Sequence, residues 1–170
     1  MAAGDVKLVY GTASDVTITL ASLASDTSKL TGRESTAIDN TSNLYLDYLV
    51  SGKITTGTSP TDARSIEIWA VASWDGTTWP DVFDGTDSAE TITIAQIKTT
   101  ICRLVTSIPT TSTSDRTYHF AGHSIAALFG GVVPPKFVIF VTHNTAVNLN
   151  STSGNHQIRI QPVYQNVAAS

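Results

Sequence analysis

Two stretches of the chain alternate between apolar and polar residues with a period of two. They run from Asn43 to Val50 and from Ser65 to Ser73. Such alternation is typical of a β-strand with one buried face. No segment of the chain shows a helical period of comparable strength. The side chains expected to face the core are Leu44, Leu46, Tyr48 and Val50 in the first run and Ile66, Ile68, Ala70 and Ala72 in the second, with Asp47 and Glu67 facing away.

Short extended segments separated by polar or glycine-containing breaks continue along the sequence. The run from Phe137 to Val141 is apolar at every position, which predicts a central strand covered on both faces. Nine or ten such segments without a βαβ rhythm favour an all-β fold, an antiparallel β-sandwich of jelly-roll-like type. The expected strands are Lys7–Tyr10, Val16–Leu20, Arg33–Ile38, Leu44–Val50, Ser65–Ser73, Trp79–Phe83, Ile101–Ser107, Arg116–Gly122, Lys136–Asn144 and His156–Gln165.

Two short helices are expected as connections between strands. Thr93 and Gln96 have the spacing of a capping box at the start of the segment Thr93–Ile97. Ser124 is placed to cap a second helix over residues 125–129, which Gly130 would end in a left-handed conformation.

Length and composition predict one weakly charged domain. The chain has 170 residues, of which 41% are hydrophobic and only 14% charged, while Thr and Ser make up roughly a quarter. We expect a single domain over residues 1–170 with a short polar N-terminal arm at about residues 1–6. A hydroxyl-rich surface is easily desolvated and has little self-repulsion, so it favours oligomerisation or docking.

Several partners and settings are disfavoured by the same composition. The net charge is −4 and the ten Lys and Arg residues are scattered, so we expect no nucleic-acid partner. No apolar run is long enough to cross a bilayer and the first residues lack the pattern of a signal peptide, which predicts neither membrane binding nor export. Cys102 is the only cysteine and is expected to be a small core residue.

Four carboxylates lie close together in the segment from residue 75 to residue 87. Oxygen clusters of this kind can ligate calcium, although the spacing is not that of an EF-hand. Two of the aspartates also precede glycine, in Asp75-Gly76 and Asp84-Gly85, which are common turn dipeptides that need no ion. The candidate calcium ligands are Asp75, Asp81, Asp84 and Asp87.

The remaining polar residues do not form a recognisable catalytic or metal motif. His119 and His123 would share one face of a strand, but zinc needs further ligands and none follows at a suitable spacing. A nucleophile elbow, a glycine-rich phosphate loop and paired catalytic acids are all missing. We therefore predict a protein without enzymatic activity, cofactor or resident metal.

Three tryptophans recur at intervals of five residues. Exposed aromatic rings on a β-sandwich can form a platform for sugar rings, and Trp74 and Trp79 are the candidates for such a glycan site. The alternative is that Trp69 and Trp79 pack against the sandwich while Trp74 flanks the Asp75-Gly76 turn.

Three segments carry a resemblance to a known class of proteins: residues 32–40, residues 72–80 and the ending from Phe137 to Tyr164. In style and order they resemble small structural proteins of tailed bacteriophages, and the whole chain resembles capsid decoration, or cement, proteins of jelly-roll type. The resemblance implies a virion component, made in the host cytoplasm, that binds the major capsid protein of an assembled shell as a homotrimer. The alternative is a carbohydrate-binding module of a phage tail or head fibre, or a free glycan-binding module.

Contacts with such a shell are expected from loops, because strands are committed to the sandwich. The expected contact elements are the arm Met1–Asp5 and the loops Thr55–Thr61 and Pro109–Asp115.

Overall fold

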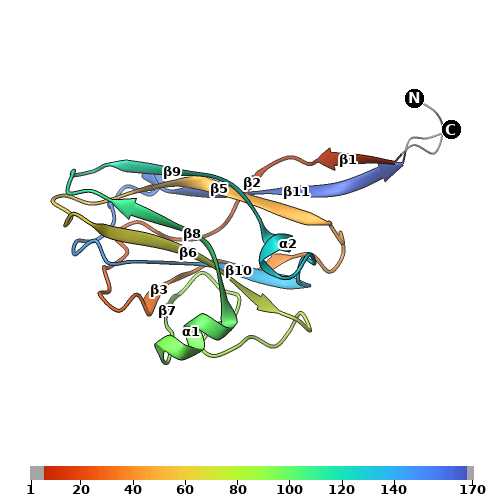
Figure 1. Ribbon diagram of the computed structural model, residues 1–170, viewed down its shortest axis with the longest axis horizontal. Helices are drawn as coiled ribbons and strands as arrows, with labels where there is room; N and C mark the ends of the chain where they lie inside the picture. The colour runs from red at the N-terminus through yellow and green to blue at the C-terminus, as the bar shows by residue number, and fades with distance from the viewer. Residues whose placement is uncertain (1–5, 168–170) are drawn as a thin grey trace.

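The computed structural model describes residues 6–167 and contains two antiparallel sheets packed face to face (Figure 1). This confirms the all-β sandwich. Sheet A has the order β1 (Val6–Tyr10), β11 (Gln157–Val167), β5 (Asp47–Thr55) and β9 (Thr117–Ser124), with β2 (Ser14–Asp15) also paired to β11. Sheet B has the order β7 (Ala89–Thr91), β3 (Thr31–Glu34), β10 (Lys136–His143), β6 (Arg64–Ser73) and β8 (Cys102–Thr110), with β4 (Ile38–Asp39) paired to β10. The short helices are α1 (Ala95–Ile101), α2 (Ile125–Leu128) and the 3-10 turn η1 (Ser153–Asn155).

The pairing of the main strands is nested from the ends of the chain toward its middle. β1 pairs with β11, β3 with β10, β5 with β9 and β6 with β8, and successive pairs alternate between the two sheets. A long hairpin rolled up in this way is the strand order of a jelly roll. The expected jelly-roll type is therefore confirmed.

The core lies between the sheets and is built from one face of each strand. Ile66, Ile68 and Ala70 of β6 face it and are fully buried. β10 is buried along its whole length: Phe137, Ile139 and Val141 face the core, while the residues between them face the other side of sheet B. The prediction of a central strand covered on both faces is confirmed.

A second hydrophobic cluster covers the outer face of sheet B. Val71, Val138 and Phe140 point outward from the sheet, and all three are fully buried. Their cover comes from the segment between β6 and β8, which includes α1 (Figure 1) and contributes Phe83 and Ile92. The outward face of sheet B is thus an interior surface of the same chain.

The first strand of the alternating pattern begins later than predicted. β5 starts at Asp47, whereas Leu44 has a left-handed backbone (φ +50°) and is 72% exposed, and Leu46 is exposed as well. The Asn40 side chain closes a turn here, since it accepts from the Tyr45 N–H at 2.9 Å and donates to the Tyr45 carbonyl at 3.2 Å. The inward prediction is correct for the buried residues Tyr48 and Val50 and wrong for Leu44 and Leu46.

Two other predicted strands are wrong for a shared reason. Residues 16–20 and 79–83 have no regular strand structure, yet Val16, Leu20 and Phe83 are buried. Irregular segments that insert apolar side chains under a sheet have the composition of strands without a ladder of hydrogen bonds. The predicted strand over residues 33–38 is split into β3 and β4.

The two helices differ in how well they were predicted. The Ser124 hydroxyl accepts from the Ala127 N–H at 3.0 Å and Gly130 is left-handed (φ +76°), which confirms the predicted cap and end of α2. The capping box of the first helix is wrong. α1 begins after Ile94, and the Thr93 hydroxyl donates to Asp81 instead.

Candidate functional site

An exposed apolar patch lies on the pair of strands that carries both chain ends. It consists of Val6, Leu8 and Tyr10 of β1 and Val167 of β11, each between 57% and 61% exposed. Val6 pairs directly with Val167, and Leu8 and Tyr10 follow at every second position. Because directly paired residues and alternate residues of a strand share a face, the four side chains lie on one side of the sheet. We call them the ribbon patch.

The ribbon patch is on the outer face of sheet A. In β11, Ile158 and Ile160 belong to the core cluster, so even-numbered residues face inward and Val167 faces outward. Tyr164 confirms this phase, because its ring lies 5.5 Å from that of Tyr45, which packs against the core. Lys7 and Val9 are therefore on the inward side of β1, while Val6, Leu8 and Tyr10 face outward.

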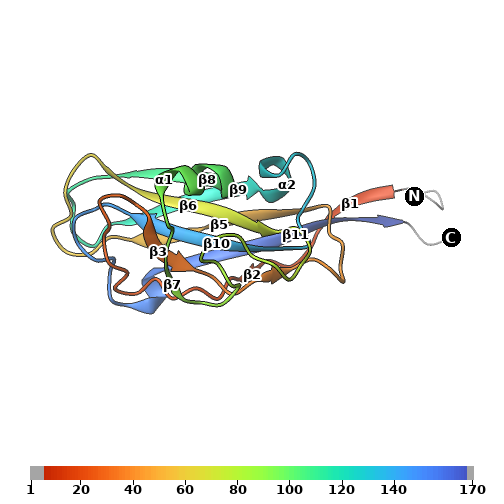
Figure 2. The same ribbon diagram turned by 90° about the horizontal axis from the view of Figure 1, so that it is seen from below.

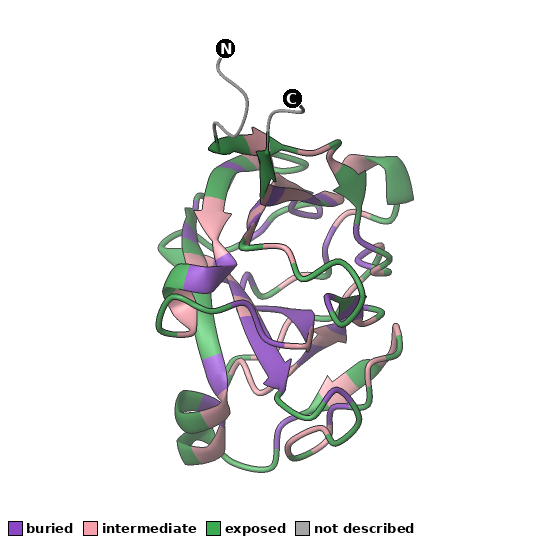
Figure 3. Cartoon of the chain, turned by 90° about the vertical axis from the view of Figure 1, so that its right-hand side faces the viewer, coloured by how far each residue is buried: buried purple, intermediate pink, exposed green. Residues whose placement is uncertain are grey.

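This part of the sheet projects beyond the body of the sandwich. In two views at right angles, β1 and the end of β11 extend past the other strands toward the chain ends (Figures 1 and 2). Seen from that side, β1 and the last three residues of β11 are mostly exposed (Figure 3). The signal that a sequence reading offers is the alternation of Val6, Leu8 and Tyr10, but alternation alone does not tell which face is covered.

β1 also presents a free backbone edge, since none of the described strands pairs with its other side. The Gly11 N–H donates to the Pro162 carbonyl at 2.8 Å, which sets the phase of the ladder. In an antiparallel pair the hydrogen-bonded positions alternate, so Val9 bonds toward β11 while the N–H and C=O groups of Leu8 and Tyr10 point away.

The two loops predicted as contact elements meet at the opposite end of the sandwich. The Asp115 N–H donates to the Gly57 carbonyl at 3.1 Å, and the Ser59 N–H donates to the Ser114 hydroxyl at 2.8 Å. Asn150 joins them by donating to Asp115 at 2.8 Å. This end is polar and internally hydrogen-bonded. The third predicted contact element, Met1–Asp5, lies outside the described residues, and Val6 already belongs to β1.

The four candidate calcium ligands are not brought together. Each carboxylate instead accepts a hydrogen bond from a threonine hydroxyl: Asp75 from Thr78, Asp81 from Thr93, Asp84 from Thr86 and Asp87 from Thr19. In residues 6–167 no group of three or more His, Cys, Asp or Glu side chains is placed to hold a metal ion.

The turn interpretation of these aspartates agrees with the geometry. Gly76 and Gly85 both have positive φ, as an Asp-Gly turn requires. The hydroxyl and N–H of Thr78, together with the Thr77 N–H, hold the pKa of Asp75 well below its usual value. Asp75 therefore remains a charged acceptor that closes its own turn.

The structure does bring the two candidate glycan-binding tryptophans together. Trp74 and Trp79 line one open groove of about 470 Å³, with Phe129 and Arg103 also on its wall. Trp74 is 60% exposed and stands edge-to-face with Phe129, at 5.8 Å between ring centroids. Trp79 and Trp69 also pack against the outer cluster of sheet B, so the packing interpretation holds for those two rings.

His119, His123, Cys102 and His143 are further residues whose side chains could react or ligate a metal. His119 and His123 lie on β9, in the part of the chain where no metal-binding cluster is found. Cys102 is buried in the outer cluster, and burial raises the pKa of its thiol to about 12. His143 is fully buried and its ring bonds to Thr145 and to the Leu23 carbonyl.

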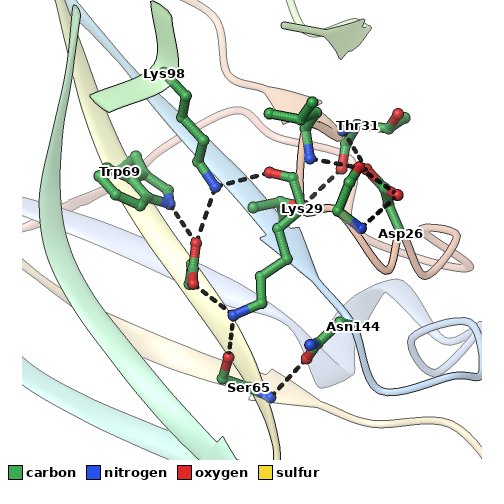
Figure 4. A network of polar contacts seen from close by, with 11 residues as sticks. Asp26, Lys29, Thr31, Ser65, Trp69, Lys98 and Asn144 are labelled. Carbon is green, nitrogen blue, oxygen red and sulfur yellow. Dashed lines mark hydrogen bonds and ion pairs between the residues drawn. The ribbon is translucent and has the colours of Figure 1, made fainter. Parts of the chain in front are cut away.

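A charged network fastens the cover onto sheet B (Figure 4). The Glu67 carboxylate on β6 accepts from Lys29 at 2.6 Å, from Lys98 of α1 at 2.9 Å and from the Trp69 indole at 3.0 Å. Lys98 is buried, donates also to the Lys29 carbonyl and lies 4.6 Å from the Trp69 ring centre. Burial opposes ionisation of Glu67, but the two lysines outweigh it and lower the pKa of its carboxyl.

Glu34 is the other buried carboxylate under this cover. It is fully buried on β3 and accepts from the Gly85 N–H at 2.7 Å. Burial raises its pKa to about 7, with the charges of Asp84 and Glu90 adding to the effect.

Comparisons with known proteins add no assignment: no family model, curated protein or solved structure matches the chain. In the described part of the chain, none of the helices combines the length and the apolar composition that crossing a bilayer takes.

Proposed function

We propose that this protein is a structural component of a bacteriophage virion, a capsid decoration or cement protein that binds the assembled shell as an oligomer and stabilises it. The observation that carries the proposal is the ribbon patch, which favours a protein that acts as an oligomer. It consists of four uncharged apolar side chains on a face that solvent-exposed strands normally fill with polar residues. Burying such side chains stabilises an assembly by roughly 1 kcal/mol each, given that about 60% of each is exposed.

The other features fit a protein that acts by binding. The sandwich is closed by nested strand pairs, and its candidate chemical residues are engaged in turns and packing. The polar loop end offers serine and threonine groups for contacts that a few hydrogen bonds can make. In this proposal the partner is the major capsid protein, the oligomer is a homotrimer, the location is the capsid surface after synthesis in the host cytoplasm, and no catalysis or cofactor is involved.

Binding to an assembled shell can be tested directly. We expect the protein to co-sediment with empty shells and to raise the temperature at which they open, because a ligand that binds only the assembled state stabilises it by mass action. Unassembled capsid protein is the control and should not retain the protein. Co-sedimentation with neither form at saturating protein would contradict the proposal.

A second candidate function, glycan binding, is favoured by one observation. Trp74 and Trp79 share an open groove, and the Trp74 ring is available for stacking on a sugar face. Arg103 lies at the wall as a hydrogen-bond donor for hydroxyls. A module with this site would suit a phage tail or head fibre.

A glycan array separates the two functions. Binding of an oligosaccharide that Trp74→Ala abolishes would support the glycan-binding module. Tyr10→Ala is the matched control, because it removes an aromatic ring of similar exposure on β1, away from the groove. Absence of glycan binding together with retention on shells would leave the decoration protein as the function.

A further inference from the structure

We infer that the ribbon patch is the surface through which copies of this chain associate, with the patch of one copy packed against those of its neighbours. This rests on the proposed function, in which the protein binds as an oligomer, and it names the interface of that oligomer. The partner at this surface is thus a second copy of the chain, and the shell contacts lie elsewhere.

On the central strands of sheet B, this chain itself covers the apolar residues that face outward. Val71, Val138 and Phe140 point outward there and are fully buried under the segment between β6 and β8. The ribbon patch receives no such cover from residues 6–167. On β1, Val6, Leu8 and Tyr10 face outward while Lys7 and Val9 face inward, so the outward face is the more apolar of the two and is left uncovered.

Charge complementarity then selects the kind of partner. The four patch residues carry no charge, and two charged side chains of the same face are bonded within the chain: Arg159 pairs with Asp15 at 3.1 Å, and Asp47 accepts from the N–H groups of Tyr48 and Ala126. Lys53 is also on this face, but it lies opposite Gln157, at the end of β11 away from the patch. An acidic or basic partner would gain nothing from this surface and would lose hydration. Another uncharged apolar patch complements it, and a second copy supplies one.

The small area of the ribbon patch favours contact with more than one neighbouring copy. Four side chains make a patch smaller than the roughly 800 Å² per partner of a standard interface. Around a rotation axis each patch contacts two neighbours, so the same side chains are buried more completely than in a single pairwise contact. The ribbon is suited to this position because it projects beyond the body of the sandwich (Figure 1).

Packing of faces is favoured over pairing of edges. The free edge of β1 would let two copies join their A sheets through backbone hydrogen bonds. Such a joined sheet would leave both ribbon patches in water, so the dimer would expose twice the apolar area of one patch. Packing the patches against one another removes that area, which is the dominant favourable contribution in association.

The test is the oligomeric state of Leu8→Glu, measured by size-exclusion chromatography with light scattering over a wide concentration range. We expect the wild type at three times the 18.0 kDa mass of the chain and the variant at the mass of one chain, with association weakened by about 100-fold or more. Leu104→Glu is the matched control, since Leu104 is exposed on β8 of the other sheet and the variant should keep the wild-type mass. A wild-type circular dichroism spectrum and a cooperative thermal transition of the monomeric variant show that it is folded, although its midpoint should fall because association no longer stabilises it.

A second variant separates faces from edges. Val6→Pro removes a backbone N–H that points away from β11 and keeps an apolar side chain, so it blocks edge pairing only. We expect it to keep the wild-type mass. Loss of association in Val6→Pro but not in Leu8→Glu would overturn the inference in favour of edge pairing.

The outcomes distinguish this inference from the proposed function. An oligomer that dissociates in Leu8→Glu but never binds shells supports the interface and contradicts the decoration protein. A protein that binds shells as isolated monomers, or an oligomer that Leu8→Glu leaves intact, overturns the interface and leaves shell binding standing.

Discussion

The outer faces of the two sheets differ although the same chain builds both. Sheet B presents Val71, Val138 and Phe140 outward and covers them with α1 and the neighbouring segment. Sheet A presents Val6, Leu8 and other apolar groups outward near its edge and leaves them in water. The comparison teaches that outward apolar side chains can be interior to the chain or exposed to water, and that the burial of each side chain tells which. Only the exposed face is open to the second copy that we propose.

The comparison predicts its largest effect at Phe140. Phe140→Ala should lower the free energy of unfolding by about 4 kcal/mol, because the ring is fully buried and stands edge-to-face with Phe83 at 5.4 Å. Urea denaturation followed by fluorescence measures this. A cost below about 1 kcal/mol would mean that the cover over sheet B is loose and that the two outer faces are alike.

The charged network under the cover predicts the next largest effect. Glu67→Ala should cost about 3 kcal/mol, because it leaves the buried Lys98 and the nearby Lys29 without their shared carboxylate. Glu67→Gln is the control and should cost less, since its amide oxygen still accepts a hydrogen bond. Equal costs for the two variants would contradict this, because the lost charge would then account for the whole effect and the amide oxygen for none of it.

The same network predicts how stability responds to acid. The pKa of Glu67 is lower in the folded chain than the ordinary value of 4.5, so its contribution is present above that value and is lost as the pH falls through the folded pKa. Glu67→Gln should therefore lose less stability on acidification than the wild type. Parallel pH profiles for the two proteins would contradict this.

The raised pKa of Glu34 should give the opposite dependence on pH. We expect the free energy of unfolding to change on the order of 2–3 kcal/mol. Its folded pKa of about 7 lies above the ordinary 4.5, so the folded state is favoured by the protonated form and loses stability as the pH rises from about 4.5 to about 7. Glu34→Gln cannot ionise and should remove that loss. The measurement is the difference in unfolding free energy between wild type and variant at pH 5 and pH 8; a difference that does not change with pH would overturn the assignment.

Strong local patterns made much of this fold predictable. The uninterrupted run of apolar residues in β10 indicated cover on both faces before any partner was visible, and the Ser124 cap with Gly130 defined α2. In each case the residues that determine the element lie within it or within two residues of its ends. A jelly-roll-like sandwich was expected from the number of strands, but the strand order was not predictable, because it comes from contacts between distant segments.

The failures have a common cause, which is that contacts with residues outside an element decide its structure and burial. Val16 and Leu20 are buried without a ladder, and the Asn40 side chain holds Tyr45 in a turn, so the strand begins only at Asp47. The candidate tryptophans did converge on one groove, but the four aspartates did not converge on a metal site. Residues 7–10 were predicted as a strand, but β1 has apolar residues on both faces, so its sequence does not tell which face stays exposed.

The smallest expected effect is the sharpest test of the comparison. Leu8→Ser should change the free energy of unfolding of the monomer by no more than about 0.5 kcal/mol, because Leu8 is 57% exposed and its removal leaves no cavity. Denaturation must be measured where the protein is monomeric, so that lost association does not enter. A cost near that of Phe140→Ala would mean that the chain itself covers β1. The outer faces would then be alike, and neither would need a second molecule.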